Sequence, residues 1–333
     1  MTKDKIKKYK RGTFMSNVAF LWIFSRGMEL GVIVLCLLPL RFLLRKKVPR
    51  LFSYLLWMAI PVNIGYNLCE IIWSNFSKDI ADRVYGAPKV MVAEKTVQIM
   101  KSFWVGGSLI VIFGMTYSYI LFLRRLIGSI RLRDGIYIAE RIRSPFTLGI
   151  ICPKIYLPLS LKEEYYESVI LHESVHIARR DIWMKYIAIG LLGLFWFQPI
   201  LWFAYRMFIN DMEEACDEAV LRKKGEDFKE EYARALVEVS FQVSKVRGVA
   251  IGYGNGEIKT RIRNVMNYRQ AGKKPCIFAV ILCCLFIVIA IPISWQVPRV
   301  VHGELAKNEG KQRKVTIMGE DMLKEEVTKV KIE

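Results

Sequence analysis

The stretch Leu171-His172-Glu173-Ser174-Val175-His176 holds two of the three histidines in this chain of 333 residues. On a helix, positions i and i+4 share a face, so both imidazoles can reach one metal ion. Glu173 lies one residue round the helix and can polarise a water at that metal. An H-E-x-x-H pattern is the minimal set of residues for a zinc-dependent hydrolase. This stretch therefore predicts a helix that carries a metal site.

The flanking residues predict how far this helix extends. Ser160 and Glu163 form the S-x-x-E pattern of a capping box, which places the start of the helix at Ser160. Arg179 and Arg180 suit the last turn, because cations are favourable at the negative end of the helix dipole. We therefore expect a helix of about 20 residues that begins at Ser160.

The composition is that of a membrane protein. Hydrophobic residues make up 53% of the chain and its mean hydropathy is positive, yet its formal net charge is +19. The basic residues cluster at the ends of apolar segments, which indicates that they face the cytoplasm and anionic lipid. This clustering makes direct nucleic-acid binding the weaker interpretation of the charge. The seven cysteines are scattered without a C-x-x-C pair and predict free thiols.

Four apolar stretches are long enough to cross a bilayer, which needs about 20 residues. The first ends at Leu44 and begins between Val18 and Met28. The other three are residues 51–73, 103–123 and 275–295. If all four stretches cross the membrane, the alternation of sides places the N-terminus outside. The N-terminus is basic, which does not fit an outer segment, so it stays open whether translation begins at Met1 or at Met15.

Basic clusters at the joints predict the orientation of these spans. They follow span one, follow span three and precede span four: Arg41, Arg45, Lys46, Lys47, Arg50, Arg124, Arg125, Arg131, Arg133, Lys273 and Lys274. All three clusters fall on one side if every span crosses, and that side should be cytoplasmic. The predicted parts are a basic segment 1–17, a membrane region 18–123, a cytoplasmic domain 124–274, a fourth span 275–295 and an extracytoplasmic tail 296–333.

A fifth apolar stretch, residues 183–208, lies inside the predicted cytoplasmic domain. A single crossing there would put the chain after Phe208 on the opposite side from His172. Pro199 lacks a backbone N–H and breaks helices, so we predict a helical hairpin that bends near Gln198-Pro199. Its tryptophans favour a hairpin that dips into the inner leaflet, because tryptophan concentrates at headgroup level. A buried soluble hairpin is the alternative.

Two histidines and a water leave zinc short of one protein ligand. His302 is predicted to lie outside, beyond the fourth span, so the third ligand must be a carboxylate or a thiolate. The run N-D-M-E-E-A-C-D-E follows the hairpin in a helical pattern. Glu213 and Asp217 are four residues apart, so one can bind the metal while the other orients a ligand histidine. Glu214 and Cys216 are weaker candidates, because their helical phase differs.

This ordered set of motifs resembles that of the integral-membrane zinc peptidases of the BlaR/MecR type, which are β-lactam-sensing antirepressor transducers. The matching runs are S-P-F-T-L-G at 144–149, I-Y-L-P at 155–158, H-E-S-V-H-I-A-R-R-D at 172–181, W-F-Q-P at 196–199, E-E-A-C-D at 213–217 and K-T-R-I at 259–262. The resemblance implies a mainly α membrane protein with four transmembrane helices. A gluzincin-like α+β zinc peptidase domain would lie between the third and fourth helices.

The resemblance also implies the roles of the site residues. It makes His172, His176 and Glu213 the ligands of one zinc ion, Glu173 the general base and Asp217 the residue that orients a ligand histidine. It further implies that residues 146–157 form an edge strand, against which an extended substrate peptide pairs. The positions expected to receive the peptide are Phe146, Thr147, Leu148 and Gly149. The oxyanion donor stays open among Arg, Tyr, Asn and backbone groups.

The chain departs from the full-length sensors of this type after the fourth span. Those sensors carry a large extracellular penicillin-binding domain there, whereas residues 296–333 are too few for one and contain no S-x-x-K motif. We therefore do not expect this chain alone to sense β-lactams.

These patterns predict a multi-pass protein of the bacterial cytoplasmic membrane with its catalytic domain on the cytoplasmic side. Its expected function is to cleave a cytosolic regulator resembling a transcriptional repressor, and also itself. Membrane lipid, a separate sensor protein and a second copy in a homodimer are further expected partners. One alternative is a non-catalytic transducer or scaffold with a structural zinc site. Another is a quality-control membrane metallopeptidase, against which the S-P-F and R-R-D context argues.

Overall fold

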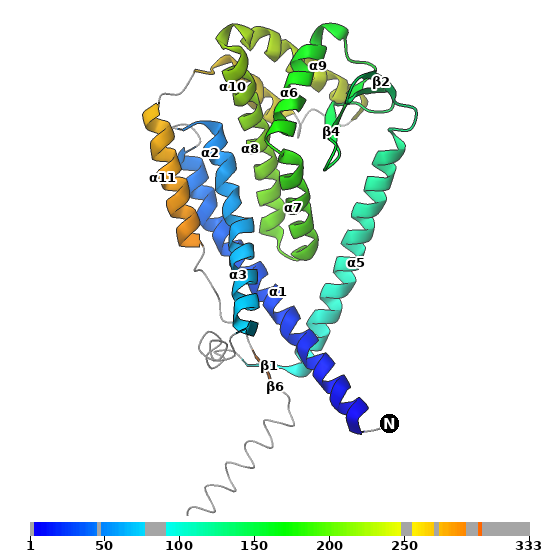
Figure 1. The fold of residues 1–333 in the computed structure, drawn as a ribbon, viewed down its shortest axis with the longest axis vertical. Coiled ribbons are helices and arrows are strands. Elements are labelled where there is room, and N and C mark those ends of the chain that lie inside the picture. The colour runs from blue at the N-terminus through cyan, green and yellow to red at the C-terminus, as the bar shows by residue number, and fades with distance from the viewer. Residues whose placement is uncertain are drawn as a thin grey trace, which may run out of the picture. The chain divides into compact units, whose positions relative to one another are not determined.

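A computed structural model of the chain describes residues 3–44, 48–76, 91–247, 255–269, 273–290 and 299–301. Most of these residues are helical, and the strands form one four-stranded and one two-stranded sheet (Figure 1). The chain divides into two compact units, which are described separately. The first contains Met1–Arg26, Trp73–Gly106 and Trp295–Glu333, and the second contains Gly27–Ile72 and Gly107–Ser294.

Three helical stretches among the described residues are long and apolar enough to cross a membrane. They are Ala19–Leu44 in α1 (Lys3–Leu44), Arg50–Cys69 across α2 (Arg50–Leu55), the 3₁₀ helix η1 (Leu56–Met58) and α3 (Ala59–Phe76), and Lys95–Arg124 in α5 (Glu94–Arg124). These stretches overlap the first three predicted spans. α11 (Lys273–Ala290) covers most of the fourth predicted span, whose residues 291–295 lie outside the described part of the chain.

The first unit contains a two-stranded parallel sheet. β1 (Met91–Ala93) pairs with β6 (Arg299–Val301). β1 belongs to the predicted outer loop after span two, and β6 belongs to the predicted outer tail. The pairing therefore brings these two segments, which are distant in sequence, beside each other. The rest of the predicted tail, residues 302–333, lies outside the described residues.

The second unit contains a four-stranded sheet in the order β2-β3-β5-β4. Its strands are β2 (Ile130–Arg133), β3 (Ile136–Ala139), β4 (Phe146–Leu148) and β5 (Lys154–Pro158). β3 and β5 are parallel, whereas the other two pairs are antiparallel. β4 is thus at one edge, and the inner strand β5 contributes Ile155 and Leu157 to the core.

The single strand predicted over residues 146–157 is wrong. The chain turns back at Gly149, where φ is +111° and a Cβ atom would come within 2.6 Å of the Cys152 carbonyl oxygen. This backbone conformation suits glycine, because L side chains rarely adopt it. The turn leaves only β4 at the edge and makes β5 an inner strand, so Gly149 is outside the edge strand.

The histidine helix begins later than predicted. A 3₁₀ turn, η2 (Glu163–Tyr165), precedes α6 (Tyr166–Ala178), and the N-cap residue of η2 is Lys162. Ser160 lies in the turn before it, so the predicted capping box does not start the helix. α6 packs on the sheet through Tyr166 and Val169, which share a buried cluster with Ile155 and Leu157.

A sharp bend follows α6. Arg180 adopts a left-handed conformation with φ 58° and ψ 33°, and α7 (Asp181–Leu194) starts at the next residue. α8 (Pro199–Lys224) then runs back beside α7, with Pro199 at its first position, where a missing N–H is harmless. α9 (Lys229–Arg247) and α10 (Asn255–Met266) complete the helices packed around α8.

The turn between α7 and α8 is seated on glycines of α1 and α5. The Trp196 ring fills the space over Gly107 of α5, and the Phe197 ring lies over Gly27 of α1. Gln198 Nε2 donates a hydrogen bond to the Gly27 carbonyl at 3.0 Å. The bend predicted near Gln198-Pro199 is thus present, and its tip contacts two of the apolar helices.

Candidate metal centre

His172, His176 and Glu213 converge on one point between α6 and α8. The two Nε2 atoms are 3.2 Å apart. The Glu213 carboxylate oxygens lie 3.4 Å from His172 Nε2 and 3.6 Å from His176 Nε2. A tetrahedral zinc ion with bonds of about 2.0–2.2 Å requires its ligand atoms to be about 3.3–3.6 Å apart. The two Nε2 atoms are close to this spacing, and the Glu213 carboxylate turns Oε2 to His172 and Oε1 to His176, so the three side chains form a triangle that could hold one metal ion.

The three groups also perturb one another electrostatically. Burial raises the pKa of the Glu213 carboxyl, but the two imidazoles and Arg261 outweigh burial and hold that pKa well below its usual value. Burial lowers the pKa of His176, but Glu213 and Asp181 raise it well above the usual value. A carboxylate and two imidazoles fixed this closely form a donor set suited to a divalent cation.

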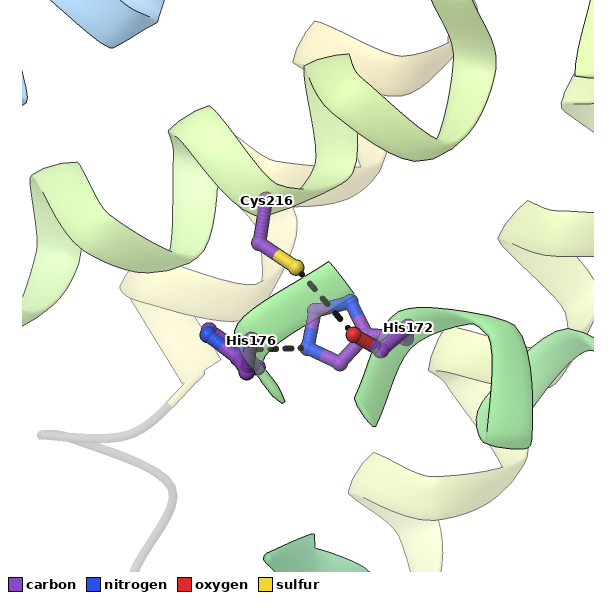
Figure 2. Close-up of side chains that lie close together, drawn as sticks. All are labelled: His172, His176 and Cys216. Carbon is purple, nitrogen blue, oxygen red and sulfur yellow. Dashed lines mark hydrogen bonds between the residues drawn. The ribbon is translucent and has the colours of Figure 1, made fainter. Parts of the chain in front are cut away.

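Cys216 is the rival third ligand. Its Sγ atom and one nitrogen of each histidine lie within 4.8 Å of one another (Figure 2). However, Cys216 is fully buried and its thiol donates a hydrogen bond to the His172 carbonyl oxygen at 3.4 Å. Glu213 lines the same cavity as both histidines, and Cys216 does not. The geometry therefore favours Glu213 where a substrate could reach the metal.

The other candidates on α8 lie away from the triangle. Glu214 is buried and lies 3.4 Å from Arg50 Nη1. Asp217 faces Nδ1 of His172, at 3.5 Å, which is the opposite side of the ring from Nε2. His302, which the sequence excluded as a ligand, lies outside the described residues.

His172 is held by a relay from the helices that follow α8. Its Nδ1 lies 2.7 Å from the Tyr232 hydroxyl, which donates a hydrogen bond to Asp217 at 2.7 Å. Burial and the Asp217 charge raise the pKa of Tyr232 well above its usual value, so the phenol keeps its proton. Arg261 donates to both oxygens of Asp217 at 2.8 Å. Asp217 thus contacts His172 mainly through Tyr232.

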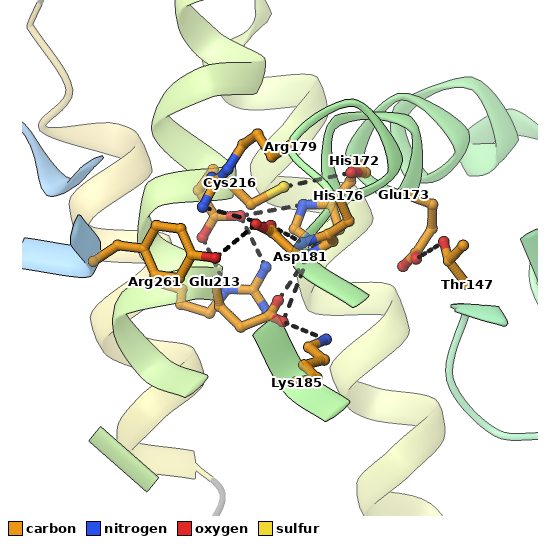
Figure 3. Close-up of polar contacts among 12 residues, drawn as sticks. Thr147, His172, Glu173, His176, Arg179, Asp181, Lys185, Glu213, Cys216 and Arg261 are labelled. Carbon is orange, nitrogen blue, oxygen red and sulfur yellow. Dashed lines mark hydrogen bonds and ion pairs between the residues drawn. The ribbon is translucent and has the colours of Figure 1, made fainter. Parts of the chain in front are cut away.

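His176 is held by a different carboxylate. Its Nδ1 lies 2.7 Å from Oδ2 of Asp181, the fully buried first residue of α7 (Figure 3). The left-handed turn at Arg180 points this side chain back toward α6. If Nε2 binds a metal, Nδ1 carries the proton and donates it to Asp181, which fixes the orientation of the ring.

Glu173 faces the edge strand. Its Oε2 accepts a hydrogen bond of 2.8 Å from the Thr147 hydroxyl of β4 (Figure 3). Phe146, Thr147, Glu173 and the three converging side chains all line one cavity of about 250 Å³. Leu148 and Gly149, also expected to receive substrate, do not line it. The cavity thus joins the base, the triangle and the first part of β4.

Two cations line this cavity and were not predicted to act there. Lys185 Nζ lies 3.8 Å from Glu213 Oε1, and Arg261 Nη1 lies 3.4 Å from Glu213 Oε2. Arg179, which was expected in the last turn of the histidine helix, lies over the Tyr54 ring at 4.8 Å and does not line this cavity. Lys185 and Arg261 are therefore better placed than Arg179 to meet negative charge in the cavity.

Sequence reasoning missed three residues that hold the histidines: Asp181, Tyr232 and Arg261. Asp181 ends the R-R-D run directly after the helix, and a carboxylate just past a ligand histidine is a usable signal. Arg261 stood in the quoted K-T-R-I run without a role. Tyr232 has no comparable signal, because an aromatic residue at a buried helical position ordinarily indicates only packing.

Comparison with known proteins agrees with the motifs. The family model described as BlaR1 peptidase M56 matches residues 77–265. The chain is 26% identical over 166 residues to the methicillin resistance mecR1 protein of Staphylococcus aureus strain Mu50. The matched region covers 46% of this chain and 28% of that protein. It is 28% identical over 153 residues to the regulatory protein BlaR1 of Bacillus licheniformis. This match covers 42% of this chain and 26% of that protein. The chain thus matches about a quarter of the length of these relatives.

Proposed function

The chain belongs to the BlaR1 peptidase M56 family, and on that premise we propose that it is a membrane-embedded zinc endopeptidase. The observation that carries the proposal is the convergence of His172, His176 and Glu213 beside the buried Glu173: the two Nε2 atoms are 3.2 Å apart, and each has a Glu213 carboxylate oxygen within 3.4–3.6 Å. Three protein ligands leave the fourth position of a tetrahedral site open, as in catalytic rather than structural zinc sites.

The proposed roles follow from the contacts in the cavity. When bound, zinc supplies Lewis-acid polarisation of water and of a peptide carbonyl. Glu173 takes the proton from the attacking water and later passes it to the leaving amine. Thr147 holds the Glu173 carboxylate in place through its hydroxyl. Lys185 and Arg261 line the same cavity and can stabilise the negative charge that develops on the carbonyl oxygen.

The substrate is proposed to be an extended peptide that pairs with β4. An edge strand has unpaired main-chain groups on one side, and a peptide can add to it as a further strand. β4 is the edge of its sheet and its residues Phe146 and Thr147 line the cavity. A peptide along β4 would therefore pass the base and the triangle.

We place the cavity on the cytoplasmic side of a bacterial membrane crossed four times. The basic clusters support this orientation, and so does the pairing of β1 with β6. The hairpin tip supports membrane insertion of residues 183–208, since Gly27 and Gly107 lie inside helical stretches long enough to span a bilayer. The proposed substrate is a cytosolic regulator of the repressor type, with self-cleavage in addition. The relative named as a regulatory protein supports that choice.

Replacement of Glu173 by Gln tests this function. The variant should keep its zinc but cleave about 10²–10⁴-fold more slowly, because only the base is removed. Comparing the proteomes of wild-type and Glu173→Gln cells should then reveal a cytosolic fragment that disappears. Glu164→Gln is the matched control, since Glu164 is exposed on η2. Unchanged cleavage by Glu173→Gln would sink the proposal.

The rival function is a non-catalytic transducer whose zinc only stabilises the domain. Structural zinc sites usually have four protein ligands, and Cys216 is the residue near enough to supply a fourth. This rival predicts that Glu173→Gln signals normally while Cys216→Ala loses zinc. The proposed peptidase predicts the reverse for both variants.

A further inference from the structure

One face of the second apolar helix is bound to the elements that carry the metal centre. Residues 50, 54 and 57 follow the i, i+4, i+7 spacing of a helix face. The Arg50 guanidinium lies 3.4 Å from the Glu214 carboxylate, and Trp57 Nε1 donates to Asp211 at 2.8 Å. Both carboxylates are on α8, the helix that carries Glu213. Between them, the Tyr54 hydroxyl donates to Asp181 at 3.0 Å.

Asp181 joins Tyr54 to His176. Its Oδ1 accepts from the Tyr54 hydroxyl, and its Oδ2 lies 2.7 Å from Nδ1 of His176. The carboxylate has no exposed surface, so these bonds are not exchanged for water. A hydrogen bond in such a site is stronger than one in water, and its loss leaves a buried oxygen less satisfied.

The Tyr54 ring is itself fixed in position. It is 5% exposed and stacks on Phe208 of α8 with ring centroids 5.7 Å apart. The Arg179 guanidinium lies over the Tyr54 ring, 4.8 Å from the ring centroid. The 3₁₀ helix η1 starts two residues later, at Leu56. A 3₁₀ stretch within a helix often marks a hinge, and η1 separates α2 from α3 at such a stretch.

We propose that Tyr54 is a positioning residue for the metal centre: it fixes Asp181, and through Asp181 it fixes the ring of His176. A tilt of α2 would change the Tyr54–Asp181 bond and so the placement of one zinc ligand. The inference rests on the proposed function, because it takes His176 as a zinc ligand. It names the second span as the element through which a membrane event regulates that same site.

The test uses the full-length chain in detergent micelles or nanodiscs and reads out the metal rather than cleavage. Zinc affinity is measured against a competing chelator, and the visible spectrum of the Co²⁺-substituted protein reports ligand geometry. The variants are Tyr54→Phe, Asp181→Asn and the double variant. Tyr66→Phe is the matched control, because Tyr66 is an exposed tyrosine of α3 in the same apolar stretch.

Tyr54→Phe keeps the ring and its packing and removes only the hydroxyl. It should weaken zinc binding by about 3- to 10-fold and shift the Co²⁺ spectrum. Asp181→Asn should weaken zinc binding by about 10- to 100-fold. Because Tyr54 acts through Asp181, the double variant should match Asp181→Asn within about twofold. Tyr66→Phe should match wild type in both measurements.

Two results would overturn the inference while leaving the proposed function intact. In the first, Tyr54→Phe binds zinc like Tyr66→Phe with an unchanged Co²⁺ spectrum. In the second, the losses of Tyr54→Phe and Asp181→Asn multiply in the double variant, which would mean that Tyr54 acts only on the general stability of the fold. A wild-type chain that binds no zinc would instead overturn the proposed function, and this inference with it.

Discussion

The two histidines share one face of α6, yet they are held by different parts of the molecule. His172 is bonded to Tyr232 on α9, and behind it lie Asp217 and Arg261. His176 is bonded to Asp181, and behind it lies Tyr54 in an apolar helix long enough to span a membrane. One imidazole is therefore fixed by α8, α9 and α10, and the other by α7 and an apolar helix long enough to span a membrane.

This difference gives the proposed site an asymmetric control. A change in the contacts among α8, α9 and α10 would act on His172, whereas a movement of α2 would act on His176. Glu213 belongs to both halves, because its carboxylate faces both rings. The position of a metal ion held by all three groups would change with a movement of either half.

The largest effect should come from the shared residue. Glu213→Gln removes the charge that both imidazoles face and should weaken zinc binding by more than about 100-fold, beyond the loss expected from an outer partner. Zinc content of the purified full chain measures this. Glu214→Gln, which disturbs the contact with Arg50 instead, should keep its zinc. A greater loss of zinc from Cys216→Ala than from Glu213→Gln would assign the third ligand to the thiol.

The next effect concerns the residues that hold His172. Tyr232→Phe breaks the link between His172 and Asp217 and should weaken zinc binding by about 10- to 100-fold, because Tyr232 contacts the ring itself. This loss should exceed that of Tyr54→Phe, which acts one residue further away. The same chelator competition measures both. Tyr268→Phe is the control, since Tyr268 packs against the same buried cluster. Equal losses from Tyr232→Phe and Tyr268→Phe would contradict the relay.

The smallest effect concerns the tip of the hairpin between α7 and α8. A methyl group on Gly107 would overlap the Trp196 ring, whereas one on the adjacent Gly106 would meet nothing within 4 Å. Gly107→Ala should therefore lower the free energy of unfolding by about 1–2 kcal/mol, the usual cost of overpacking. Thermal unfolding in detergent compares the two variants. Similar melting temperatures for Gly106→Ala and Gly107→Ala would show that the tip is not seated there.

Local patterns in the sequence predicted the elements that local physics determines. Four-residue spacing placed His172 and His176 on one helical face, and Pro199 marked the bend between α7 and α8. The capping box failed because the chain first forms a turn and a 3₁₀ segment, which delays the α-helix to Tyr166. The edge strand was predicted too long, because the reversal at Gly149 was not read as a turn.

The residues behind the ligands could not be predicted in the same way. Tyr54 is 127 residues from Asp181 in sequence, and Tyr232 is 60 residues from His172. Contacts over such distances depend on how whole helices pack, which no local pattern encodes. Thr147 stood in a predicted strand, but its bond to Glu173 required the register between β4 and α6. The candidate ligands lie on short-range patterns, and the residues that hold them come from tertiary packing.

The bond between Thr147 and Glu173 has a consequence for cleavage specificity. Along a strand, side chains alternate between faces, so Thr147, which bonds to the base, lies on the opposite face of β4 from Phe146 and Leu148. A peptide added to β4 can slide only in steps of two residues without reversing its own faces. Main-chain register against Thr147, rather than any single side chain of the substrate, would then decide which peptide bond is cut. The proposed peptidase would then tolerate many sequences at the scissile bond.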